Sequence, residues 1–439
     1  MQTQKIPVDW FIGETTFPST AFGSSESGTS SVHGSVEGRH RTQRLGEFRA
    51  NATLLRWLAI GFAICWVATA APPNKEGLAL EESRMGIAQT LRLDDAAWRT
   101  GNVESFVKQI DPNVGVEWSS AWQREWNLAR HAPDSHRSVQ DSQLLAAISI
   151  GDLMMVPVQV DRPIANAWHQ SPYVENRFYR LNADKWQRTA PPETFWGRQK
   201  SLATANLRID YVERDGQLIE PLMPELERLI VSIYTQAGIP LPPPQAKRHL
   251  IFVPSLQTKW EVTGYPIEIV SPTLLPIAVA LTPQEAIIDT VSRRVIHRMM
   301  LESSYGFRPI WQVLTVGMEN WLRVTVTDVP SLWHQRVVPL FWAEAEDHMP
   351  LELIDITDGR SLKLTSEERQ LWKYMAAQTI IEYVHEVYGP EAPARLLHRF
   401  PAHRTWHALI EDTFGVSVQA WEAGWNEYLV TQIKEQEHP

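Results

Sequence analysis

The chain has little cysteine and no excess of basic residues. It contains one cysteine, Cys65, so it cannot form an internal disulfide or a zinc site built on two to four thiolates. Asp and Glu outnumber Lys and Arg by 51 to 41, and the resulting net charge of -10 argues against a nucleic-acid-binding protein. The sequence has neither a glycine-rich phosphate loop nor a G-x-S-x-G nucleophile motif.

The rest of the composition indicates a folded body with more than one domain. Hydrophobic residues make up 44% and charged residues 21%, as in ordinary globular proteins, and 439 residues suffice for two or three domains. The 19 tryptophans fit either an aromatic core or a body near a membrane interface.

The N-terminal residues predict a basic tail without a core. Residues 19–35 are rich in serine and glycine and hold too few apolar side chains to fold. Five arginines then precede or open an apolar segment: Arg39, Arg41, Arg44, Arg49 and Arg56. We therefore interpret residues 1–53 as a disordered basic tail.

One apolar segment is a candidate membrane span. Residues 57–71 carry no charge, and Pro72 and Pro73 end the helix that this run predicts. Fifteen helical residues rise only about 22 Å, whereas a hydrocarbon core is about 30 Å thick. Adding the three preceding residues gives about 27 Å. We predict a single-pass transmembrane helix at residues 54–71.

The flanking charges predict the orientation of this span. Four arginines precede the span and Arg56 lies in its first turn, but only Lys75 follows it closely, which favours a cytoplasmic N-terminus and an extracytoplasmic body. Two other interpretations stay open. One is a signal peptide cleaved after the A-x-A sequence at residues 68–70, and the other is a buried helix of a globular domain.

Residues 82–195 predict a first domain. We expect a helix that Gly101 ends, a short helix capped by Asn102, a strand at 153–160, and a hairpin over 177–189 that turns at 182–184. The apolar stripe expected on the first helix consists of Met85, Ala88, Leu91, Ala96 and Trp98.

This order of elements resembles the cone-shaped fold of the nuclear-transport-factor and ketosteroid-isomerase superfamily. Two helices precede antiparallel strands that end in the pattern FYRL…W at residues 178–186. The resemblance implies an α+β domain whose interior often holds an acid. Asp94 and Asp111 are the candidates, but Asp94 in a helix and Asp111 before a proline are also typical of structural residues.

A second region follows the proline-rich join at residues 189–197. We expect a hairpin over 207–220 that turns at Asp215 and Gly216, and a buried strand at 249–254.

A long helix is predicted further along this region, and its start is marked by side chains. Thr282 and Glu285 have the spacing of a capping box at the N-terminus of a helix. The stripe expected to face the core consists of Ile287, Val291, Val295 and Met299.

Together with the C-terminal helices, this order resembles the gluzincin-type (peptidase MA-like) metallopeptidase domain over residues 198–436. The tail is similar to the closing pattern of that family, with Gly415 followed by a helix that carries Trp421, Trp425 and Tyr428. In active members, two histidines of an H-E-x-x-H helix bind zinc, and the glutamate activates water. A glutamate on the next helix supplies the third ligand.

The residues at the motif positions differ from those of an active member. The motif aligns with the sequence RRVIH, where Arg293 and Arg294 replace the first histidine and the glutamate, and only His297 matches. Guanidinium groups stay protonated and cannot bind zinc. Val316 stands at the position of the third ligand, and Glu319 follows about one helical turn later. We predict a degenerate site without catalytic residues or metal, in which His297 and Glu319 are the remaining candidate ligands.

Two further clusters carry residue types that bind divalent ions. Residues 342–350 include three carboxylates and a histidine, and His403 and His407 would share one face of a helix. Both patterns are also typical of solvated surface residues.

The sequence as a whole predicts an α+β protein with a single transmembrane helix, a cone-like domain and a mixed α/β-to-helical domain. We expect it to bind a protein or peptide at the cell membrane, without a cofactor and without nucleic acid. Two alternatives stay open: an active zinc peptidase with rearranged ligands, and a surface sensor that uses the interior of the cone.

Overall fold

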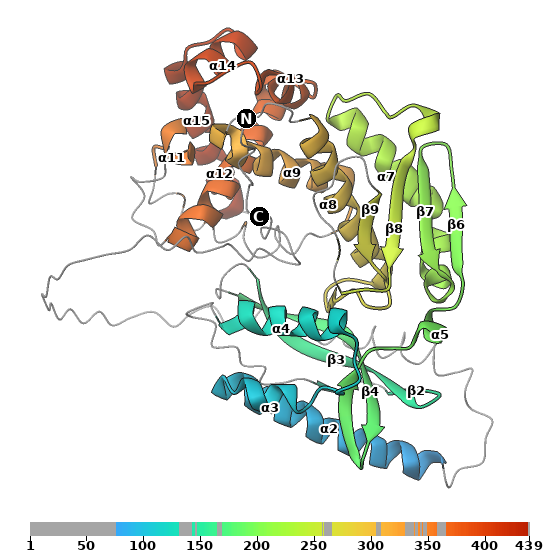
Figure 1. The fold of residues 1–439 in the computed structure, drawn as a ribbon. Helices are drawn as coiled ribbons and strands as arrows, with labels where there is room; N and C mark the ends of the chain where they lie inside the picture. Colours follow the sequence, from blue (N-terminus) through green and yellow to red (C-terminus); the bar gives the residue numbers. More distant parts are fainter. Residues whose placement is uncertain are drawn as a thin grey trace, which may run out of the picture.

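The computed structural model describes residues 76–130, 143–144, 147–164, 169–256, 258, 266–303, 309–329, 338, 341–342, 345, 349–357 and 366–437. These residues form a mixed α+β structure with two sheets, as the sequence predicts (Figure 1). The predicted tail at 1–53 and the predicted span at 54–71 lie outside the described residues. Within the described ranges, no helix is both long and apolar enough to cross a membrane.

Three helices open the described chain and form a layer at one end of it (Figure 1). Gly101, with φ of 63°, ends the first helix, and the Asn102 side chain accepts a hydrogen bond from the backbone N–H of Ser105 at 3.0 Å. Both predicted helices are therefore confirmed, whereas the third helix was not predicted. The three are α2 (Glu76–Thr100), α3 (Val103–Val107) and α4 (Val116–Arg130).

The apolar stripe predicted for α2 is partly wrong. Leu91 is buried, but Met85 is 61% exposed and Ala96 faces solvent. The inner face instead includes Asp94, which forms an ion pair with Arg177 (Nη1 to Oδ2, 3.5 Å). An apolar pattern cannot reveal a buried face that contains a charge paired from another element.

Six antiparallel strands form the first sheet. The order is β1-β3-β4-β10, with β2 paired to β3 and β5 paired to β4. The hairpin predicted over 177–189 is confirmed, because Ala183 and Asp184 join β4 to β5 with positive φ. The strands are β1 (Gln143–Leu144), β2 (Ile148–Ile150), β3 (Leu153–Ile164), β4 (His169–Asn182), β5 (Lys185–Thr189) and β10 (Ile277–Ala278).

The second sheet has four strands in the order β6-β7-β8-β9. β6 is antiparallel to β7, and the other neighbours are parallel. The strand predicted at 249–254 is confirmed as β8. The strands are β6 (Gln199–Ala203), β7 (Leu207–Val212), β8 (Arg248–Val253) and β9 (Ile267–Val270).

The hairpin predicted over 207–220 is wrong. The chain after β7 enters helical turns and does not return beside β7, which pairs with β6 and β8. Asp215 is fully buried and accepts hydrogen bonds from Ser271 Oγ (2.9 Å) and Thr273 Oγ1 (2.7 Å). The Asp-Gly pair therefore fastens the loop after β9 and does not form a hairpin turn.

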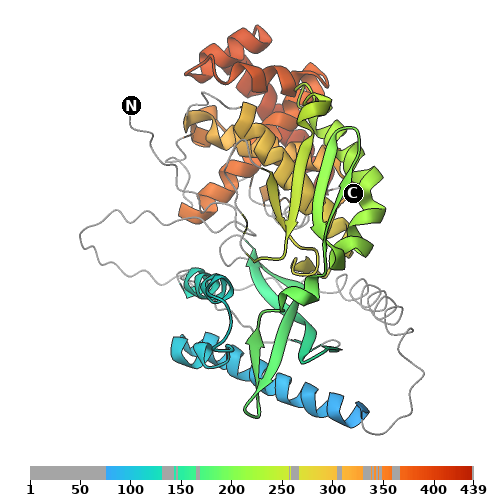
Figure 2. The same cartoon turned by 45° about the vertical axis from the view of Figure 1, so that its right-hand side comes forward.

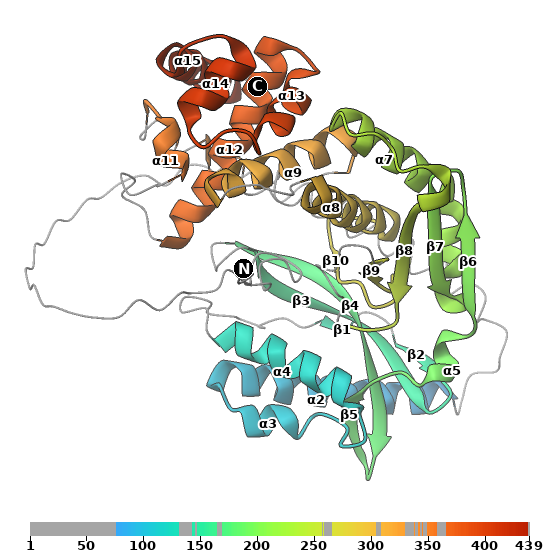
Figure 3. The ribbon, with the colours of Figure 1, turned by 45° about the horizontal axis from the view of Figure 1, so that its top comes forward.

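Helices cover one face of the second sheet (Figure 3). The capping box is confirmed: Glu285 N–H donates to Thr282 Oγ1 at 3.2 Å, and Thr282 N–H donates to Glu285 Oε2 at 2.7 Å. All four residues of the predicted stripe on α8 are buried. The segments around this sheet are α5 (Glu193–Trp196), η2 (Glu213–Asp215), α6 (Gly216–Ile219), η3 (Glu220–Leu222), α7 (Met223–Gln236), η4 (Pro244–Ala246) and α8 (Pro283–Ser303).

Of the remaining helices, α9 packs against α8 and α12 packs against α9. A Cβ on Gly317 would lie 2.6 Å from the Ala377 carbonyl carbon, so α9 and α12 cross with their backbones close together. Trp421 and Trp425 are fully buried in the core. The segments are η5 (Pro309–Trp311), α9 (Gln312–Val326), α11 (Leu353–Thr357), α12 (Ser366–Tyr388), α13 (Ala392–Arg399), α14 (Trp406–Phe414) and α15 (Val418–Glu437).

Strand pairing and a side-chain hydrogen bond join the two regions, in addition to the chain that runs between the sheets (Figures 1 and 2). After β9, the chain returns to the first sheet, where Ile277 pairs with Val174 in β4. Asn176 Nδ2 also donates to the carbonyl oxygen of Thr273 at 2.8 Å. The first sheet is therefore completed by a strand from the second region.

Candidate functional site

The motif positions lie where α8 and α9 pack against each other. His297 Nδ1 is 3.1 Å from Glu319 Oε1, and both side chains are largely buried. Two turns earlier on α8 and one turn later on α9, Asp289 Oδ1 is 2.8 Å from Arg323 Nε. The structure thus brings the two candidate ligands together, but it places a second charge pair beside them.

Arg293 lies between these pairs, one helical turn from each partner on α8. Its Nε is buried and has no hydrogen-bond partner among the described residues. Burial lowers the pKa of Arg323, and the charge of Arg293 lowers it further, whereas Asp289 opposes the shift. The side chain at position 293 is therefore a cation that repels the neighbouring Arg323.

Arg294, which the predicted resemblance aligned with the general base, points to the other side of α8 and contacts Thr258 Oγ1. It is only 7% exposed. Burial, together with the charges of Arg293 and Arg298, lowers the pKa of Arg294 to about 8, and Glu268 on β9 opposes the shift. Positive charge is therefore held at this site at a cost in free energy.

Val316 does not complete a ligand set. It is half-buried on α9 beside Gly317, where α9 crosses α12. Among the described residues, no three His, Cys, Asp or Glu side chains are placed to hold a metal ion. His297 and Glu319 can supply two ligands at most, one fewer than a catalytic zinc site requires.

Sequence reasoning missed Asp289 and Arg323. Asp289 is one turn before Arg293 on α8, and a search for charges at i and i+4 around the motif would have drawn attention to it. No sequence pattern marks Arg323, because only the packing of α9 on α8 brings it next to Asp289.

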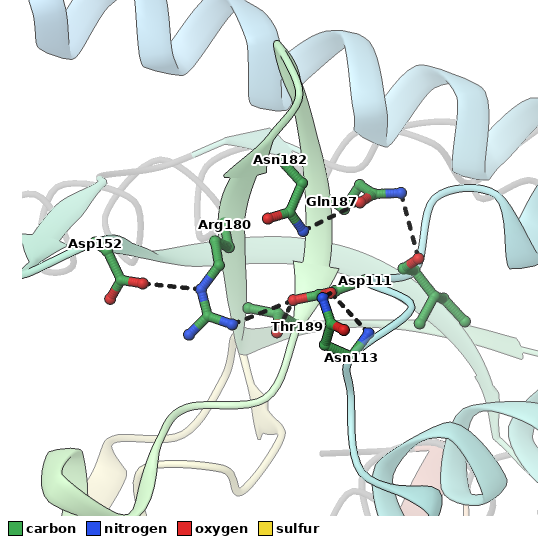
Figure 4. Close-up of polar contacts among 8 residues, drawn as sticks. Asp111, Asn113, Asp152, Arg180, Asn182, Gln187 and Thr189 are labelled. Atoms are coloured by element: carbon green, nitrogen blue, oxygen red, sulfur yellow. Dashed lines mark hydrogen bonds and ion pairs between the residues drawn. The ribbon is translucent and has the colours of Figure 1, made fainter.

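Asp111 is held by donors from several elements (Figure 4). It is fully buried and accepts hydrogen bonds from the Asn113 backbone N–H (2.9 Å), Thr189 Oγ1 (2.9 Å) and Arg180 Nη1 (3.2 Å). Burial opposes ionisation, but these donors keep the pKa of Asp111 below its usual value. A carboxylate that is ionised and fully engaged is suited to fastening the loop before α4 to β5, and it is poorly suited to proton transfer.

Asp94 belongs to a second buried cluster, between α2 and the first sheet. Arg177 contacts it and also donates from Nε to Glu175 Oε1 at 2.6 Å. Burial alone would lower the pKa of Arg177, but Glu175 and Asp94 raise it well above its usual value. Arg188 lies over the ring of Trp122, with 4.7 Å from Cζ to the ring centroid. Both aspartates named from the sequence therefore have arginine partners.

The other two candidate clusters provide no assembled site. The cluster at residues 342–350 lies largely outside the described residues. His403 Nε2 contacts Asp412 Oδ2 at 3.0 Å, and His407 faces solvent.

No known family model matches the chain, and no curated protein matches it.

Proposed function

We propose that this chain is a membrane-anchored extracytoplasmic binding protein whose second region has a metallopeptidase-like scaffold without metallopeptidase chemistry. The observation that carries the proposal is the set of buried charged side chains at the motif positions on α8 and α9. Arg293 and Arg294 occupy the positions that a peptidase gives to a histidine and a glutamate, and the remaining His297 and Glu319 are in contact with each other. Anchorage through residues 54–71 and the extracytoplasmic location follow from the sequence.

The charge at this site favours a ligand with an anionic group. Arg294 stays buried although burial and two neighbouring arginines oppose its charge. Charges held at such a cost are typical of functional sites. A carboxylate of a protein or peptide ligand would offset that cost, because arginine pairs with carboxylates through two parallel hydrogen bonds.

The decisive experiment is a zinc measurement on the full-length protein in detergent. Wild type is expected to hold far less than one zinc per chain by elemental analysis, and stoichiometric zinc would overturn the proposal. The matched variant Arg293→His/Arg294→Glu/Val316→Glu restores the family's ligand types. It is expected to gain zinc, and if it folds without doing so, the peptidase-like alignment is wrong.

A binding assay tests the choice of ligand. Fluorescent peptides rich in Asp and Glu are expected to bind wild type and to bind Arg294→Met more weakly by about tenfold, as for the loss of one charge-assisted contact. Lysine-rich peptides of equal length are the control. Equal binding of both peptide types would contradict an anionic ligand.

An active peptidase with rearranged ligands is the alternative that the 3.1 Å contact between His297 and Glu319 favours. It would need a third ligand from elsewhere. Cleavage of a peptide substrate that stops with a chelator and returns with zinc would support it, provided that His297→Ala abolishes the same cleavage.

A sensor that uses the interior of the first region is the alternative favoured by the cluster around Arg177. The Tyr173 hydroxyl and the Trp122 indole N–H are also buried there without hydrogen-bond partners. Deleting residues 1–50 should abolish the cellular output of a sensor and leave a scaffold unaffected.

A further inference from the structure

Exposed apolar side chains gather on the first helices. Leu93 is 48% and Val107 is 57% exposed, and Met85, Val103 and Val116 are exposed as well. All five lie within residues 85–116. The six other large apolar side chains that are exposed in the described chain are spread over residues 148–430. A concentration of this kind marks an interaction surface more often than single exposed residues do.

The same stretch is basic. Between residues 92 and 108, Arg92, Arg99 and Lys108 are exposed, and Glu104 is the only exposed acid. None of the three basic side chains forms an ion pair with a described residue, whereas Arg180 pairs with two aspartates. A helical surface that combines apolar side chains with unpaired basic ones suits the interface of a membrane with anionic headgroups.

The position of this surface in the chain favours a lipid surface over other occupants. α2 begins at Glu76, five residues after the predicted membrane span ends at residue 71. Five residues reach about 17 Å at most when fully extended. α2 and α3 also form the end of the described structure opposite α13 and α14 (Figures 1 and 2).

We infer that the outer face of α2 and α3, from Met85 to Lys108, lies on the surface of the bilayer and contacts anionic lipid headgroups. The inference rests on the anchorage under the proposed function, and it adds an orientation: the first region faces the membrane, and α13 and α14 point away. The α8–α9 site is then presented to ligands on the far side of the first sheet.

Environment-sensitive labels on the full-length protein test this orientation. Cys65 is the only cysteine, so a Cys65→Ala background accepts a single label at Leu93→Cys or Val107→Cys. Matched controls outside the first region are Val387→Cys on α12 and Val430→Cys on α15, which are also exposed. Each protein is compared in detergent, in phosphatidylcholine vesicles, and in vesicles that also contain phosphatidylglycerol.

A blue shift at positions 93 and 107 in phosphatidylglycerol vesicles, with none at 387 and 430, is the expected result. Replacing Arg92, Arg99 and Lys108 by Gln should reduce the docked fraction by about fivefold for each charge removed. The same changes at Arg395, Arg404 and Lys434, exposed basic residues of the C-terminal helical region, should leave it unchanged.

The outcomes separate docking from anchorage. Flotation with vesicles reports anchorage alone, so protein that fails to float refutes the anchor, and docking with it. Protein that floats without a shift at 93 or 107 refutes docking and leaves the anchor intact. A shift of equal size in detergent would indicate a contact between protein chains and would also overturn the inference.

Discussion

Buried charges are compensated differently in the first and second regions. Near α2 and the first sheet, Asp111 has a lowered pKa and Arg177 a raised one, so the surroundings of each favour its charged form. On α8 and α12, burial lowers the pKa of Arg294 to about 8 and raises that of Glu382 to about 7. In the first region the surroundings of Asp111 and Arg177 favour their charged forms. In the second region burial disfavours the charged forms of Arg294 and Glu382.

The contrast is not a property of the second region as a whole. Arg248 on β8 pairs with Glu302 Oε2 at 2.6 Å, and its pKa is raised although burial opposes this. Burial that disfavours the charged form is therefore confined to particular positions, and Arg294 is one of them.

Removing Asp111 is expected to have the largest effect. Asp111→Ala should lower the free energy of unfolding by about 3 kcal/mol, because it leaves the partly buried Arg180 and the donors around it without their acceptor. Asp152→Ala is the control, since this partner of the same arginine is 70% exposed and should cost less than about 1 kcal/mol. Denaturant unfolding measures both. Equal losses would show that Asp111 does not fasten the loop.

The titration of Glu382 is expected to change the free energy of unfolding by an intermediate amount. Burial and the neighbouring Glu386 raise its pKa, whereas a hydrogen bond from Gln378 opposes the shift. The folded state therefore binds more protons than the unfolded state between about pH 4.5 and 7, and the free energy of unfolding falls as pH rises through that window.

Glu382→Gln should remove this fall and make the protein more stable than wild type by about 2 kcal/mol at pH 8, with little difference near pH 4. Glu386→Gln is the control, because Glu386 is exposed and should have a much smaller effect. If the stability of Glu382→Gln depends on pH as that of wild type does, the pKa of Glu382 is not raised by its burial.

The smallest effect is expected at Arg294. Arg294→Met should leave the free energy of unfolding unchanged or raise it by about 1 kcal/mol, because a charge that burial disfavours is replaced by an apolar chain. Arg248→Met is the matched test of a compensated arginine and should lose about 2 kcal/mol. Thermal and denaturant unfolding distinguish the two. A loss at Arg294 as large as that at Arg248 would remove the contrast between them.

The sequence by itself determined the features whose causes are local. Gly101 ends a helix through positive φ, and Thr282 with Glu285 starts α8, because each effect involves residues within one turn. It also determined that Arg293 and Arg294 cannot bind zinc, since that follows from the chemistry of guanidinium.

Only the tertiary structure decided the features that depend on distant partners. Asp215 looked like a turn residue, yet Ser271 and Thr273 made it a buried acceptor. The return of β10 to the first sheet and the approach of Arg323 to Asp289 have no local signature. Pairing energies depend on which segments meet in space, and residues far apart in the chain meet only once the core has packed.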